Sequence, residues 1–113
     1  MRLRNIKDKE ELIDNCSYLI RNIDNLKGKW DKEFLNDNPL HLEIGMGKGD
    51  FIYNMALLYP DVNFIGIEKY SGVIARAIKK YPVKLDNLRI INMDAEDLNK
   101  VFFKEIEKIY LNF

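Results

Sequence analysis

The sequence predicts an α/β fold in which a mostly parallel sheet of about four strands carries helices on both faces. Two observations support this prediction. From residue 40 onward, short apolar stretches alternate with stretches of helical periodicity, which is typical of parallel strands joined by crossover helices. Three glycines also follow the first apolar stretch directly, where a strand would turn into a helix. The predicted fold class is therefore a Rossmann-like, doubly wound sheet, incomplete at about four strands.

The alternation assigns each element in order. The predicted strands are 40–44, 62–68, 87–93 and 108–113, and the predicted helices are 49–59, 71–81 and a short one within 97–106. Pro60 ends the first of these helices, because proline lacks the backbone N–H that would continue it. Right-handed crossovers bring the carboxyl ends of parallel strands to one edge of the sheet, so residues at those ends should lie close together.

The residues before 40 follow a different pattern. An apolar stripe at helical spacing between residues 8 and 23 predicts a helix or a broken helix. The polar stretch that follows predicts a connection, which Trp30 and Phe34 would pin to the body of the protein. We therefore expect an N-terminal helical and connecting segment, residues 1–39, and a partial ligand-binding domain, residues 40–113.

The balance of charges limits which partners the chain could attract. Eighteen basic and eighteen acidic residues give a formal net charge of zero, so no overall field would draw the chain to nucleic acid. Any RNA contact must come from a local patch. The densest candidate in the sequence is the N-terminus, where Arg2, Arg4, Lys7 and Lys9 lie close together; a solvated chain end is the alternative.

Cysteine content and hydropathy indicate the compartment. The single cysteine, Cys16, cannot form an intramolecular disulfide and has no cysteine or histidine at metal-ligand spacing, so we assign no metal site. No apolar run approaches the ~18 residues of a membrane span. The N-terminus lacks the apolar region of a signal peptide. These features predict a cytoplasmic protein.

The stretch "HLEIGMGKGDF", residues 41–51, contains three glycines spaced by two. A phosphate-binding P-loop is excluded, because the spacing is wrong and the Ser or Thr after the lysine is missing. A dinucleotide fingerprint needs glycine at position 50, where Asp50 would instead repel a pyrophosphate. The loop therefore favours a nucleoside that carries no phosphate, with a ligand-free turn and a nicotinamide site as the open alternatives.

Three acids lie, like the glycine loop, at or near the carboxyl ends of predicted strands. Glu43, Glu68 and Asp94 are separated by 25 and 26 residues, each at or near the end of a predicted strand. Glu68 could accept hydrogen bonds from both hydroxyls of a ribose, and Asp94 from an exocyclic amine such as that of adenine. Glu43 could face an ammonium or sulfonium charge. Together these groups describe S-adenosylmethionine better than NAD.

Two polar residues near the loop are harder to assign. Lys48, between two loop glycines, could meet a ligand carboxylate or point to solvent. His41, the only histidine, has no partner at the spacing of a catalytic or metal site, so we expect a structural role.

Several segments resemble successive motifs of the bacterial tRNA (guanine-N7-)-methyltransferases, within the class I S-adenosylmethionine-dependent methyltransferases. These segments are "HLEIGMGKGDFI", "NFIGIEKY", "LRIINMDAEDL" and "IYLNF", with "MRLRN" and "GKW…NDNP" resembling the N-terminal segment of that family. The resemblance spans nearly the whole chain. It implies an enzyme that transfers a methyl group from S-adenosylmethionine to N7 of a guanosine in the variable loop of its partner, tRNA.

The resemblance also implies roles for particular residues. Glu43, Glu68 and Asp94 correspond to the cofactor-binding acids of the family. Gly45 and Gly47 would lie under the methionine portion of the cofactor, and Ala95 along the adenine edge. Residues 40–113 would then form a partial S-adenosylmethionine-binding methyltransferase domain.

One departure from the family pattern limits what we expect of this chain. In the family, "YLNF" precedes a Ser-Asp-Pro-Trp-Pro-Lys type segment that carries the catalytic aspartate, and no such segment occurs here. We therefore expect the N-terminal, cofactor-binding part of such an enzyme, assign no catalytic residue, and expect no activity from the chain alone. A non-catalytic S-adenosylmethionine-binding fragment, a partner-dependent subunit and a homodimer stay open.

Overall fold

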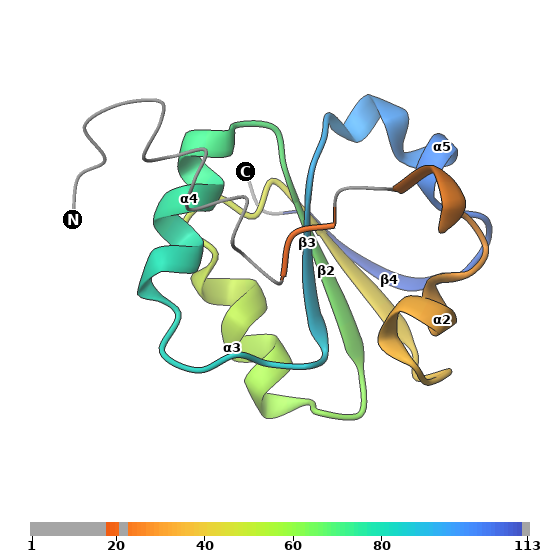
Figure 1. Ribbon diagram of the computed structural model, residues 1–113, viewed down its shortest axis with the longest axis horizontal. Coiled ribbons are helices and arrows are strands. Elements are labelled where there is room, and N and C mark those ends of the chain that lie inside the picture. Colours follow the sequence, from red (N-terminus) through yellow and green to blue (C-terminus); the bar gives the residue numbers. More distant parts are fainter. Residues whose placement is uncertain (1–17, 21–22, 112–113) are drawn as a thin grey trace.

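The computed structural model of the chain describes residues 18–20 and 23–111. Its centre is a sheet of four parallel strands in the order β3-β2-β1-β4 (Figure 1). The strands are β1 (Leu40–Ile44), β2 (Asn63–Glu68), β3 (Leu88–Asn92) and β4 (Ile106–Leu111). The predicted α/β fold class is confirmed. The described strand boundaries lie within about two residues of the predicted ones, and the predicted end of the fourth strand, 113, lies outside the described residues.

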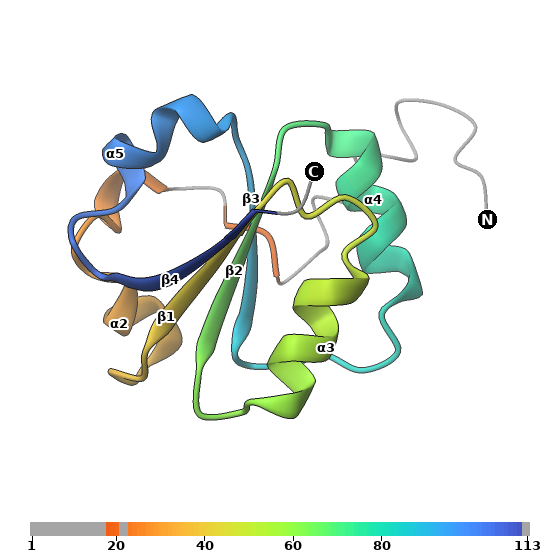
Figure 2. The same ribbon diagram turned by 180° about the vertical axis from the view of Figure 1, so that it is seen from behind.

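Helices cover both faces of this sheet. Figures 1 and 2 show α3 (Asp50–Leu58) and α4 (Ser71–Lys80) on one side, with α2 (Trp30–Phe34) and α5 (Leu98–Val101) on the other. Short 3₁₀ turns, η1 (Ile23–Asn25) and η2 (Ala95–Asp97), complete the described elements. Within residues 18–20 and 23–111, no helix is long and apolar enough to cross a bilayer.

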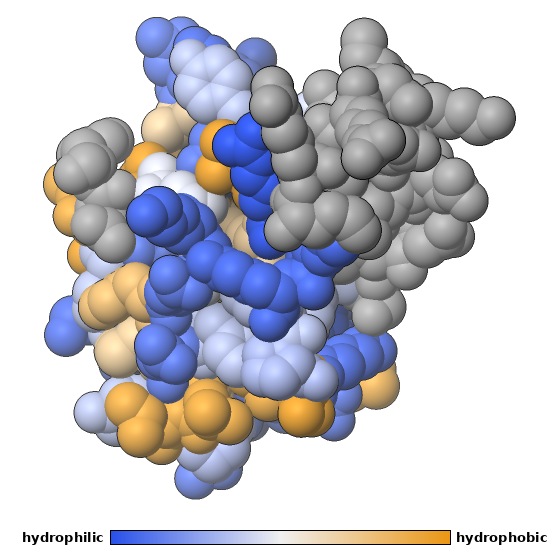
Figure 3. All heavy atoms as spheres, turned by 90° about the vertical axis from the view of Figure 1, so that its left-hand side faces the viewer, coloured by the Kyte–Doolittle hydropathy of each residue, from blue (hydrophilic) through white to orange (hydrophobic). Residues whose placement is uncertain are grey.

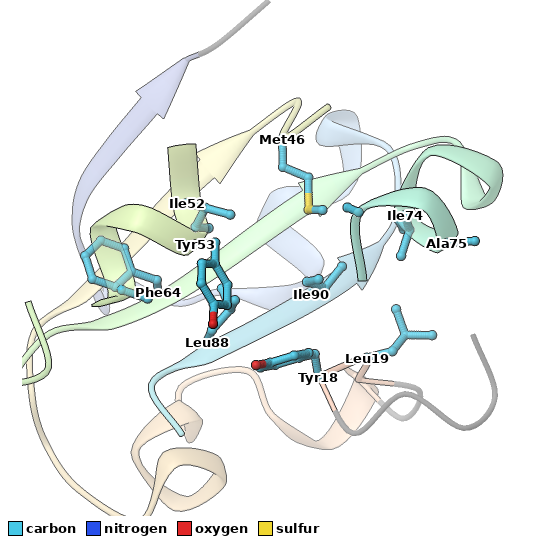
Figure 4. Packing of buried hydrophobic residues seen from close by; sticks show 12 residues of the cluster. Tyr18, Leu19, Met46, Ile52, Tyr53, Phe64, Ile74, Ala75, Leu88 and Ile90 are labelled. Carbon is cyan, nitrogen blue, oxygen red and sulfur yellow. The ribbon is translucent and has the colours of Figure 1, made fainter. Parts of the chain in front are cut away.

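The two helical layers create two apolar cores, one on each face of the sheet. Phe64 and Ile90 pack with Ile52 of α3 and Ile74 of α4 in the first core, which Figure 4 shows from close by. The second core contains Leu42 and other strand residues that alternate to the opposite face, against α2 and α5. All six residues of β2 are buried, as expected for a parallel strand covered on both faces.

The N-terminal segment adds backbone pairing to the edge of the sheet. Tyr18–Ile20 runs extended and parallel to β3: the Ile20 N–H donates to the Ile90 carbonyl, and the Ile90 N–H to the Tyr18 carbonyl, both at 2.9 Å. The helix or broken helix predicted over 8–23 lies mostly outside the described residues; of the residues described, 18–20 pair with β3 and belong to no helix, and Ile23 begins η1. This pairing satisfies backbone N–H and C=O groups on the edge of β3 and in the segment itself.

The connection before β1 is pinned as predicted. Trp30 is 2% exposed and Phe34 6%, and the Trp30 indole N–H donates to the Val101 carbonyl at 3.1 Å. The two side chains belong to α2, a short helix within the stretch that the sequence had indicated as a connection. This helix therefore anchors the segment against α5.

A glycine in β2 allows the loop after β1 to lie close to the sheet. A Cβ at Gly66 would approach the Met46 Sδ to 2.8 Å and the Ile52 Cδ1 to 3.2 Å. Since real Cβ contacts are longer than the first of these distances, only glycine leaves room for Met46, which is 3% exposed.

We expect Gly66→Ala to lower the free energy of unfolding by about 1–3 kcal/mol, because the new methyl group must displace Met46 and Ile52. Urea denaturation measures this change. In a Met46→Ala background the same substitution should cost less, because the obstructing sulfur is gone. An equal cost in both backgrounds would contradict the close approach.

Candidate functional site

A cavity of about 510 Å³ opens at the carboxyl edge of the sheet. It lies where the strands run out into the loops after β1, β2 and β3, the position at which open α/β sheets bind ligands. Five residues that the sequence indicated for cofactor binding line this cavity: Gly45, Gly47, Glu68, Asp94 and Ala95. Most of the remaining lining is apolar: Ile44, Ile67, Tyr70, Val73 and Met93, with Lys69 as the cation. The topology thus brings these five residues together.

The glycine loop has a backbone conformation that few other residues accept. Gly45, Gly47 and Gly49 have φ angles of 74°, 54° and 79°. Because a Cβ is strained in this left-handed region, the three glycines permit a loop that other residues would open. The N–H groups of Gly45 and Met46 both donate to the Ile67 carbonyl, at 2.9 and 3.0 Å. The loop is therefore folded over the end of β2.

Glu68 joins the parts of the site. Its side chain is buried, and its Oε1 accepts a hydrogen bond from the Gly47 N–H at 3.1 Å. Its Oε2 accepts one from the Tyr70 N–H at 3.0 Å, at the start of α4. Each carboxylate oxygen has capacity for about two hydrogen bonds, so both can accept from a ligand hydroxyl as well. Glu68 thus shapes the loop and faces the cavity at once.

Asp94 lies across the cavity at the end of β3. Its Oδ1 accepts from the Glu96 N–H at 3.0 Å and so caps η2, while its Oδ2 lies 3.6 Å from the Lys69 Nζ. The Asn92 side chain donates to the carbonyls of Glu68 and Lys69, at 3.0 and 2.9 Å. This amide ties the two strand ends together. Sequence reasoning missed both Asn92 and Lys69, although each lies within two residues of a predicted acid.

Tyr81 contacts the glycine loop from the layer of α3 and α4. Its hydroxyl donates to the Gly49 carbonyl at 3.0 Å, and a Cβ at Gly49 would collide with that hydroxyl. The Tyr81 ring stacks on Tyr53 with 4.5 Å between centroids, and meets the Tyr18 ring edge-on at 5.8 Å. The loop is consequently bonded to the helical layer as well as to the sheet. The local sequence around Tyr81 does not indicate this contact with the loop.

Three residues that the sequence singled out do not line this cavity. Glu43 is 1% exposed, inside β1, and a direct contact with a ligand stays a prediction. His41 contacts the Tyr110 hydroxyl at 3.1 Å and the Glu107 carboxylate at 3.4 Å, near the start of β1. Lys48 is exposed and lines a neighbouring cavity.

Comparison with known proteins identifies a family. The sequence pattern of a family described as "Putative methyltransferase" matches residues 37–113. This range includes all four strands and each of the cavity residues named above.

Curated relatives carry a more specific name. A protein of Lachnoclostridium phytofermentans named tRNA (guanine-N(7)-)-methyltransferase is 48% identical over 115 aligned residues, which cover 100% of this chain and 54% of the relative. Proteins of the same name from Bacillus cytotoxicus and Bacillus subtilis are 47% and 44% identical, with 100% and 90% of this chain covered and 54% and 49% of theirs. The chain thus spans about half the length of these relatives, and the resemblance seen in its motifs is confirmed.

Solved structures support the fold independently. The crystal structure of the antibiotic-resistance methyltransferase Kmr superposes with a TM-score of 0.63 over 73% of this chain and 45% of Kmr, at 19% sequence identity. At that identity the likeness shows the fold alone. The match over residues 37–113 shows that the chain belongs to this family of putative methyltransferases.

Proposed function

We propose that this chain is the S-adenosylmethionine-binding part of a tRNA (guanine-N7-)-methyltransferase, which methylates N7 of a guanosine in the tRNA variable loop. The observation that carries the proposal is the cavity at the carboxyl edge of the sheet, where Gly45, Gly47, Glu68, Asp94 and Ala95 converge. The names of relatives up to 48% identical supply the substrate class.

The residues present fit an adenosyl ligand. Glu68 would accept from the ribose hydroxyls through the capacity that its two backbone bonds leave. Asp94 would accept from the adenine amine, and Ile67 and Met93 offer apolar surface to the base. Gly45 and Gly47 leave room for the methionine portion, since no side chain fills the loop there.

The methyl transfer requires little proton transfer by the protein. S-adenosylmethionine supplies an electrophilic methyl group on a positively charged sulfur. Guanine N7 carries a lone pair and no proton, so its attack needs no general base. The described residues contribute binding and orientation, which lower the barrier by aligning the reacting groups. We assign no catalytic residue among residues 18–20 and 23–111.

A second candidate is a module that acts only with a partner chain. In the described sheet β4 is an outer strand, and its Ile109 and Leu111 are 49% and 66% exposed. Exposed strand edges with apolar side chains are typical of surfaces that pair with further chain. Transfer of labelled methyl groups to a tRNA transcript by the purified chain alone would exclude this candidate.

Calorimetric titration tests the cofactor directly. The chain should bind S-adenosylhomocysteine and leave NAD unbound. Glu68→Gln should weaken S-adenosylhomocysteine about 10- to 100-fold, because an amide oxygen cannot replace two charged acceptors. It should also lower the melting temperature, since Gly47 or Tyr70 loses its partner. Glu96→Gln, at an exposed site on η2, is the matched control and should change neither. NAD binding without S-adenosylhomocysteine binding would contradict the proposal.

Asp94 should determine the preference for adenine. The unaltered chain should bind S-adenosylhomocysteine about tenfold or more tightly than S-inosylhomocysteine, in which a carbonyl replaces the amine. Asp94→Asn retains the side-chain oxygen that caps η2 and adds a donor, so the preference should shrink or reverse. The ratio of the two dissociation constants measures this, and an unchanged ratio would remove Asp94 from the adenine site.

Tyr81 should act as a positioning residue for the glycine loop. Tyr81→Phe removes the hydrogen bond to the Gly49 carbonyl, and we expect about 3- to 10-fold weaker S-adenosylhomocysteine binding. Tyr53→Phe is the matched control, because the Tyr53 hydroxyl bonds to Val83 and not to the loop. Both variants should lose stability, but only Tyr81→Phe should lose affinity. Equal affinities for the two variants would contradict the positioning role.

A further inference from the structure

A second cavity, of about 570 Å³, lies beside the first and shares Gly47 and Val73 with it. Four basic side chains line this basic groove: Lys48 from the glycine loop, and Arg76, Lys79 and Lys80 from α4. No acidic side chain is among the described residues that line it. Figure 3 views this side of the molecule and shows hydrophilic side chains gathered across the middle of the face.

The stability of α4 does not account for all the basic side chains of the groove. Lys79 and Lys80 fall in the last turn of α4, where cations are stabilised by the helix dipole, and Lys80 pairs with Asp50 at 2.8 Å. Neither reason applies to Arg76, in the middle of the helix, or to Lys48, on a different element. In a chain of zero formal net charge, this concentration of cations gives the groove a local positive charge that would attract an anion.

We propose that the basic groove binds phosphate groups of the tRNA backbone next to the nucleotide that is methylated. This inference rests on the proposed function. Phosphodiesters are the repeated charges of an RNA, and lysine and arginine are their usual partners. Gly47 and Val73 line both the groove and the proposed cofactor cavity, so a backbone held in the groove would pass beside the methyl donor. The groove thus holds the substrate strand without reading its bases.

Fluorescence anisotropy of a labelled tRNA transcript, measured over a series of salt concentrations, tests the proposal. Arg76→Gln combined with Lys79→Gln should weaken binding about tenfold or more and reduce the slope of log affinity against log salt by about 1 to 2. Lys27→Gln combined with Lys32→Gln removes the same charge from exposed positions outside the groove, and should change affinity and slope much less. Lys48→Gln, on a different element, should reduce the slope by about 1.

The affinity for S-adenosylhomocysteine and the melting temperature of each protein are also measured. These measurements distinguish a loss of tRNA binding from a loss of the cofactor site or of the fold. Unchanged S-adenosylhomocysteine binding with weakened tRNA binding in Arg76→Gln/Lys79→Gln supports the groove. Equal tRNA affinities for the groove and control variants, or no tRNA binding by the unaltered chain, overturn it and leave the cofactor proposal intact. Failure of the unaltered chain to bind S-adenosylhomocysteine overturns the proposed function instead. Binding of inorganic phosphate that is lost in Arg76→Gln/Lys79→Gln, while tRNA affinity stays unchanged in that variant, would overturn the backbone as the ligand and indicate a site for free phosphate.

Discussion

The rest of the site depends on one buried carboxylate, that of Glu68. Its two oxygens accept the N–H groups of Gly47 and Tyr70, so a single side chain fixes the glycine loop and the start of α4 to the end of β2. Glu68 is 7% exposed, so burial removes much of the hydration of its carboxylate, and the two backbone bonds compensate for that loss. A ligand that bonds to Glu68 therefore meets an acceptor whose position is already set.

The same loop is held from two further directions, which makes the cavity a preformed feature of the fold. The Ile67 carbonyl accepts both loop N–H groups that precede Gly47, and the Tyr81 hydroxyl bonds to the Gly49 carbonyl from the helical side. Gly66 removes the side chain that would otherwise push the loop away from the sheet. A loop ordered before binding loses less conformational entropy when the ligand arrives, and this supports affinity. The contacts that stabilise the loop are therefore the same ones that would support binding of the proposed ligand.

Much of this arrangement could be predicted from the sequence, because buried parallel strands are apolar runs and right-handed crossovers place their ends together. That reasoning located Glu68 and Asp94 at one edge, as the structure has them. It did not indicate that 18–20 pair with β3, because the helical spacing of Leu19 and Ile20 favoured a helix or a broken helix there. Contacts between residues far apart in the chain, such as that of Tyr81 with Gly49, leave no local pattern to detect. The basic groove was missed for the same reason, since it combines Lys48 with Arg76 from another element.

The most direct test of the account is to follow the backbone amides by ¹⁵N-resolved NMR while S-adenosylhomocysteine is added. We expect the largest shifts at the amides of Gly45, Gly47, Tyr70 and Ala95, because these residues line the cavity. Amides of α2, on the other face of the sheet, should stay unchanged and serve as the internal reference. Shifts confined to other parts of the chain, or no shifts at saturating ligand, would contradict the claim that the cavity beside Glu68 is the cofactor site.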